Sequence, residues 1–201
     1  MDNILDNFLS SDTLNNITMD TGRFGSALTS SKIFDDIGNN FTKPKTNDWE
    51  WIKITILTLV GFCIYNLVVA NLINTDNIKN KNVKLAINDS LKFGTMLISV
   101  RLLLGESLAD IEWIKESLCV LIGLMAYDFG TIQLINTNKL MEDNIISKQS
   151  KLAIDDTIKF STMFFVSTWL SSKNFNKHWL FETTGFIVGI VAYDYLLSEY
   201  L

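Results

Sequence analysis

The stretch WIKITILTLVGFCIYNLVVANLI, residues 51–73, is the most apolar part of the chain. It carries one charged residue, Lys53, close to its start. With a rise of about 1.5 Å per residue, a helix of this length measures roughly 35 Å and can cross a hydrocarbon core of about 30 Å. The stretch therefore predicts a membrane-spanning helix.

The same pattern returns twice, and we call the three copies, residues 51–73, 113–135 and 179–199, the A segments. A tryptophan, a glycine and a tyrosine coincide in all three: Trp51, Gly61, Tyr65; Trp113, Gly123, Tyr127; Trp179, Gly189 and Tyr193. On a helix these positions fall largely on one stripe, and the central glycine lets a neighbouring backbone approach closely. We expect this stripe to be a packing seam; a tyrosine-lined pathway is the alternative.

A second unit, the B segments at residues 85–104 and 152–170, lies between the A segments. KLAINDSLKFGTM at 84–96 recurs as KLAIDDTIKFSTM at 151–163. Internal duplication of helix-length apolar segments is common in membrane bundles. The order A-B-A-B-A predicts an all-α, five-span transmembrane bundle over residues 49–201. A soluble all-helical protein with very apolar buried helices is the alternative.

Polar residues interrupt these segments at one depth if A and B run antiparallel. They are Asn66, Asp128 and Asp194 late in A, and Asp89, Lys92, Asp156 and Lys159 early in B. An unpaired charge inside a membrane costs at least a few kcal/mol, so we expect pairs: Lys92 with Asp128 or Asn66, and Lys159 with Asp194 or Asp128. Such a layer could be an electrostatic clasp that fixes helix register, or a path for ions or protons.

Residues 1–48 differ in composition and are expected to be a separate, polar and largely flexible segment. Gly22, Gly25 and Gly38 stand among Ser and Thr, as is typical of flexible chain. The start lacks the cationic and apolar regions of a signal peptide. A short amphipathic helix around Ile4 to Leu9 is the alternative for its first residues.

The remaining composition argues against catalysis. The chain has one histidine, His178, and two cysteines, Cys63 and Cys119, which form no CxxC pair. No phosphate-binding loop, metalloprotease motif or nucleophile elbow is present, so we expect no enzyme, no cofactor and no metal. The net charge of −5 and the scattered lysines speak against nucleic acid as a partner.

The asparagine- and lysine-rich stretches NIKNKN at 77–82 and MEDNII at 141–146 give the chain a compositional resemblance to small multi-pass proteins of AT-rich genomes, including those of large DNA viruses. The resemblance implies a virion component or a viral or host membrane as the location. We therefore expect a non-catalytic integral membrane protein with a structural or assembly role. Its partners would be the lipid bilayer and either a second copy of the chain or other membrane or capsid proteins. A small ion or proton channel or transporter using the Asp/Lys layer is the alternative.

Overall fold

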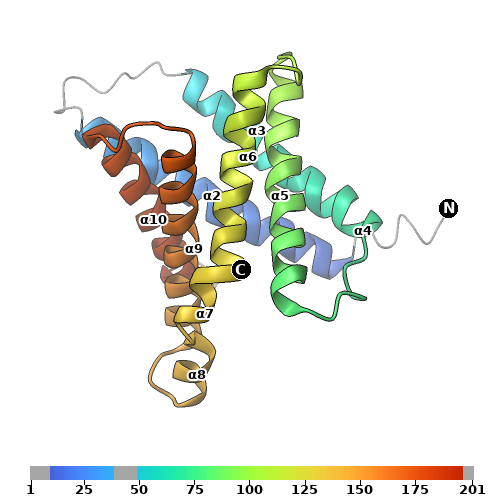
Figure 1. Ribbon diagram of the computed structural model, residues 1–201, viewed down its shortest axis with the longest axis vertical. Helices are drawn as coiled ribbons and strands as arrows, with labels where there is room; N and C mark the ends of the chain where they lie inside the picture. The colour runs from blue at the N-terminus through green and yellow to red at the C-terminus, as the bar shows by residue number, and fades with distance from the viewer. Residues whose placement is uncertain (1–9, 39–48, 197–201) are drawn as a thin grey trace.

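A computed structural model describes residues 10–38 and 49–196, and within these ranges every regular element is helical. The long helices are α2 (Ser11–Gly38), α3 (Trp49–Ile64), α5 (Lys81–Leu103), α6 (Ile111–Ala126), α9 (Lys148–Leu170) and α10 (Lys177–Leu196). Short pieces are α4 (Ala70–Leu72), α7 (Ile132–Leu134) and α8 (Thr137–Glu142). The chain is thus a helical bundle (Figure 1).

The helices begin and end where local sequence allows it. Asn80, Asp110 and Ser147 precede α5, α6 and α9, and their side chains accept hydrogen bonds from backbone N–H groups of the first turn. Gly105 and Ser172 follow α5 and α9 with φ of 74° and 57°, the left-handed conformation common after a helix. These ends lie within a few residues of the boundaries expected for the A and B segments.

Two π-helical turns interrupt the first two A segments at matching positions. They are η1 (Tyr65–Val69), between α3 and α4, and η2 (Tyr127–Thr131), between α6 and α7. The corresponding part of α10 remains α-helical through Leu196. Single π-turns often mark functional sites because they shift side chains relative to the helix before them. Here they carry Asn66 and Asp128.

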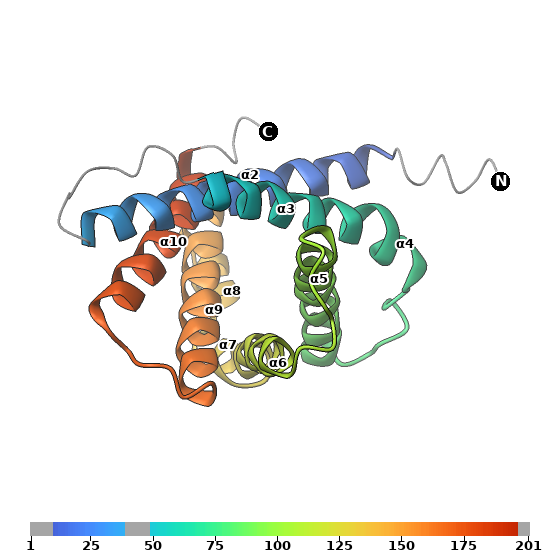
Figure 2. The same cartoon turned by 90° about the horizontal axis from the view of Figure 1, so that it is seen from above.

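The most extensive helix contacts form three pairs: α3 with α5, α6 with α9, and α10 with α2. Seen from above, α2 and α3 run across the view along one side, and α6 lies at the opposite side, viewed nearly end on (Figure 2). The last pair is antiparallel along its length, since residues early in α2 meet the end of α10 and residues late in α2 meet its start. The first and last described helices therefore close the bundle.

The expectation of flexible chain before residue 49 is wrong for residues 11–38. These residues form the 28-residue helix α2, which buries Phe24 and Ala27 in the hydrophobic core. Two of its glycines are close-packing positions: an added Cβ would come within 2.5 Å of the Tyr193 ring at Gly22 and within 2.7 Å of the Phe181 ring at Gly38. Composition misled because a helix that packs through small and polar residues has little apolar character. The proposed amphipathic helix around Ile4 to Leu9 lies outside the described residues.

Two stretches among the described residues have the length and composition of a membrane span, Trp51–Leu72 and Ile111–Leu134. They coincide with the first two A segments. The other long helices contain more charged residues, and some of these form ion pairs between α2, α5 and α9.

Candidate functional site

A ring of three ion pairs links α2, α5 and α9. Lys92 Nζ lies 2.5 Å from Asp20 Oδ1, Lys159 pairs with Asp89, and Arg23 Nε lies 3.3 Å from Asp156 Oδ2. Each cation therefore reaches the carboxylate of a neighbouring helix, in cyclic order. We call these six residues the ion-pair ring.

The contribution of α2 to this ring follows a pattern that is present in the sequence. Asp20-Thr-Gly-Arg-Phe24 matches Asp89-Ser-Leu-Lys-Phe93 and Asp156-Thr-Ile-Lys-Phe160 in residue type at four of five positions. Helix α2 thus shares a five-residue pattern with the two B segments. Searching the N-terminal residues for Asp, Ser or Thr, any residue, Lys or Arg, then Phe would have found it.

The ion pairs in the structure differ from those expected from the sequence. Lys159 pairs with Asp89 rather than with Asp194 or Asp128, and Lys92 pairs with Asp20. Asn66 lies beside the latter pair, since its Nδ2 donates to Asp20 Oδ2 at 2.7 Å. The partners differ from those expected because Asp20 and Arg23, in a segment of linker-like composition, take part in the ion pairs.

Each A segment adds one residue to the outside of the ring. Asn66 joins the Asp20–Lys92 pair, and Asp194 accepts a hydrogen bond of 2.9 Å from Arg23 Nη2. Asp128 lines the same cavity as Asp89 and Lys159. The ion pairs, hydrogen bonds and shared cavity thus bring the seven polar residues named from the sequence close to one another, together with Asp20 and Arg23.

Three phenylalanines fill the axis next to the ring. Phe24, Phe93 and Phe160 follow the three cations directly, and their rings meet edge to face with centroids 5.6 to 6.0 Å apart. This geometry is favourable for aromatic pairs. Phe62 stacks on Phe24 at 4.1 Å and extends the cluster outward. The aromatic cluster separates the two ends of the axis.

The glycines of the predicted seam lie where the paired helices approach most closely. A Cβ added to Gly61, Gly123 or Gly189 would come within 2.4 to 2.8 Å of backbone atoms of the partner helix. The partner residues are Met96, Met163 and the Ser26–Ala27 pair, which occupy matching places in α5, α9 and α2. The seam tyrosines Tyr127 and Tyr193 are buried, and Tyr65, Trp51, Trp113 and Trp179 are half-buried.

Polar cavities adjoin the ring on the side where α2, α5 and α9 begin. One of about 390 Å³ is lined by Asp89, Asp128 and Lys159, among others. A second of about 350 Å³ is lined by Asp20, Asn66 and Lys92, among others. These cavities bring the charged side chains of the ring into contact with space large enough for water.

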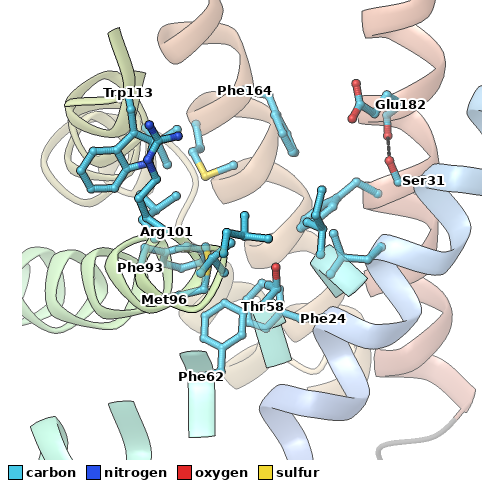
Figure 3. A pocket seen from close by; sticks show the side chains of 18 of the residues that line it. Phe24, Ser31, Thr58, Phe62, Phe93, Met96, Arg101, Trp113, Phe164 and Glu182 are labelled. Atoms are coloured by element: carbon cyan, nitrogen blue, oxygen red, sulfur yellow. Dashed lines mark hydrogen bonds between the residues drawn. The ribbon is translucent and has the colours of Figure 1, made fainter. Parts of the chain in front are cut away.

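An apolar cavity of about 400 Å³ lies on the other side of the phenylalanines (Figure 3). Its floor includes Phe24, Phe62 and Phe93, and its walls include Met96 and Phe164. Polar groups are confined to a few positions, such as Ser31, whose hydroxyl donates to the Glu182 carbonyl at 3.0 Å. The cavities on the two sides of the phenylalanines therefore differ in chemistry, with charged residues prominent in the lining of the first two and apolar residues predominant in this one.

Arg101 closes part of the rim of the apolar cavity. Its guanidinium pairs with Glu106 and with Asp110 at 2.8 Å, and it lies 5.5 Å from the centre of the Trp113 ring. The backbone N–H groups of Trp113 and Glu112, helped by Arg101, hold the pKa of Asp110 below its ordinary value. These charges are already paired, so the rim offers no free cation to a ligand.

No group of three or more His, Cys, Asp or Glu side chains in the described ranges could hold a metal ion. Cys63 and Cys119 are both free. Comparison of the chain with protein-family models, curated proteins and solved structures gives no match.

Proposed function

We propose that the protein is a non-catalytic integral membrane protein with a structural or assembly role, in which the ion-pair ring clasps the helices together. The observation that carries the membrane part is the exposure of the most apolar helices. Only 22% of the apolar window of Trp51–Leu72 and 28% of that of Ile111–Leu134 is buried. A core helix of a soluble protein would bury most of such a surface, whereas a lipid-facing helix would expose it.

The exposed side chains on these helices are large and aliphatic or aromatic. They include Ile52, Ile54, Ile56, Val60 and Val68 on the first stretch, and Ile114, Leu118, Ile122, Met125 and Phe129 on the second. Contiguous apolar surface of this kind on a soluble monomer would promote association. A bilayer would cover it without further partners.

The clasp is supported by the way the charges are paired. Each cation of the ring meets a carboxylate of another helix, which is what a polar layer inside a membrane bundle requires. Helix association in lipid depends on close packing and on such polar contacts, because lipid chains are as apolar as leucine. The seam glycines allow the paired helices to pack closely, and the ion-pair ring fixes the positions of the helices along one another.

The arrangement supports six crossings, the five expected from the sequence and α2. Helix α2 runs antiparallel to α10, so the start of α2 and the end of α10 lie at one end of the bundle. That placement fits a membrane protein with both of these ends on the same side. The compositional resemblance described above favours a virion or virus-modified membrane as the location.

Two measurements test the membrane proposal. The full chain should stay monodisperse in detergent and aggregate in plain buffer; monodispersity without detergent would contradict the membrane proposal.

The second measurement is cysteine labelling. In a background with Cys63 and Cys119 replaced by Ala, single cysteines at Asp12, Asp143 and Ser107 can be labelled with an impermeant reagent in sealed vesicles. Cysteines at positions 12 and 143 should both be labelled or both be protected from the reagent, and the cysteine at position 107 should behave in the opposite way. Equal labelling at all three would show that the bundle does not cross.

Conduction of protons or small ions is a second candidate, favoured by the polar cavities beside the ring. Against it, the phenylalanine cluster fills the axis. Proton and ion flux into vesicles that contain the wild-type chain, compared with Asp128→Asn and Asp194→Asn, separates the two candidates. Flux that both substitutions abolish would favour conduction, and no flux above empty vesicles would favour the clasp.

A further inference from the structure

We call each ion pair of the ring, together with the A-segment residue beside it, a corner of the ring. The three corners differ in how their charges are balanced. At the first corner, Asp20 and Lys92 carry opposite charges and Asn66 is neutral, so the charges balance. At another corner the A segment supplies a second carboxylate, Asp194, and the cation is an arginine. Arg23 reaches Asp156 with Nε and Asp194 with Nη2, which a planar fork can do and a single ammonium cannot do as well.

The remaining corner has two carboxylates and a lysine. Lys159 pairs with Asp89, and no ion pair joins it to Asp128 among the described residues. The side chain of Asp128 is 1% exposed, and its Oδ2 has no hydrogen-bond partner in the part of the chain that the structure describes. One carboxylate at this corner is therefore buried without a cation of its own, which is costly for an ionised group.

Other charged groups line the same cavity, and each cation is already engaged or lies at the rim. They are Asp89 and Lys81 on α5, and Lys151, Asp155, Asp156 and Lys159 on α9, with Tyr127 beside Asp128 on η2. Lys151 pairs with Asp155 at 2.6 Å, and Asp156 is held by Arg23. Lys81 lies at the exposed start of α5. None of these groups balances Asp128.

We propose that Asp128 is a proton-binding site, whose carboxyl group holds a proton at neutral pH and exchanges it with water in the adjoining polar cavity. Protonation removes the unbalanced charge and turns Oδ2 or Oδ1 into a donor, and deprotonation returns the proton to water. The inference rests on the ring and the cavity and is independent of the membrane proposal. It assigns a ligand, the proton, to one corner of a layer that is otherwise closed by ion pairs.

Infrared titration of the full chain in detergent tests the site directly, because a protonated carboxyl group has a C=O band distinct from that of a carboxylate. Wild-type protein should show this band at neutral pH and lose it as the pH rises. Asp128→Asn should lack the band, whereas the matched control Asp194→Asn should keep it. Absence of the band in wild type, or its persistence in Asp128→Asn, would overturn the proposal.

A second test replaces Lys159 by arginine, the residue that pairs with two carboxylates at the Arg23 corner. Lys159→Arg should serve both Asp89 and Asp128, so a more acidic pH should be needed to protonate Asp128. An unchanged midpoint of the infrared pH titration would contradict this comparison of the three corners.

Thermal melting gives an independent test. Since Asp128→Asn reproduces the side chain found at Asn66, this variant should fold. Wild-type stability should fall as the pH rises through the range where the folded chain holds the proton and the unfolded chain does not. A similar fall in Asp128→Asn would overturn the assignment.

Discussion

Helices α2 and α5 hold matching places in the bundle, although their compositions differ. Both place an aspartate, a cation and a phenylalanine at the axis, and both receive a seam glycine from a paired helix. Yet α5 belongs to a repeat that is obvious in the sequence, whereas α2 resembles a polar linker. The difference teaches that a few contacts at fixed positions, rather than overall hydropathy, define a place in this bundle. The predictions below test whether the two helices are energetically equivalent.

The largest expected effect is at the axis. Phe24→Ala and Phe93→Ala should each destabilise the folded chain by about 3 to 5 kcal/mol, because both rings are buried and contact the same aromatic cluster. Thermal or denaturant unfolding in detergent measures this, with the exposed Phe165→Ala as control. A cost for Phe24→Ala close to that of the control would mean that α2 is not part of the core.

The glycine seams give the next effect. Gly189→Ala at the α2 contact and Gly61→Ala at the α5 contact should each cost about 1 to 3 kcal/mol, because the new Cβ meets backbone that cannot move aside easily. Gly94→Ala, where no atom lies within 4 Å of the added Cβ, is the control and should be neutral or stabilising. Tolerance at Gly189 together with a large cost at Gly61 would break the equivalence.

A smaller effect distinguishes the two cations. Arg23→Lys should cost about 1 to 2 kcal/mol, since one ammonium cannot replace both arms of the guanidinium toward Asp156 and Asp194. Lys92→Arg should cost less, because Lys92 serves a single carboxylate, Asp20. Unfolding midpoints of the two variants decide this, and the reverse order would contradict the account of the ring.

The smallest effect concerns an exposed ion pair near the start of α5. Lys84 Nζ lies 2.7 Å from Asp76 Oδ1, and both side chains are at least a third exposed. Lys84→Ala should therefore change stability by no more than about 1 kcal/mol, as exposed pairs usually do. A loss as large as that from breaking a ring pair would show that burial does not set the strength of these contacts.

The all-helical class was predictable from the sequence, because the apolar segments 51–73, 85–104, 113–135, 152–170 and 179–199 have the length of helices. Asn66, Asp89, Lys92 and the other polar residues named from the sequence contact one another or line shared cavities in the structure. The sequence could not give the ion pairs, because two charges of the ring come from Asp20 and Arg23 in a segment of linker-like composition. The π-turns and the cavities depend on tertiary packing, for which local sequence has no clear signal.

The most direct test of the central claim is a double-mutant cycle between α2 and α5 with Asp20→Asn and Lys92→Met. Asparagine keeps an acceptor for Asn66, so the cycle isolates the charge pair. Each single substitution leaves a partly buried charge without its partner, whereas the double substitution removes both charges. If α2 closes the ring, the double variant should regain a substantial part of the unfolding free energy lost by the single variants. Strict additivity of the two losses would contradict the closed ring.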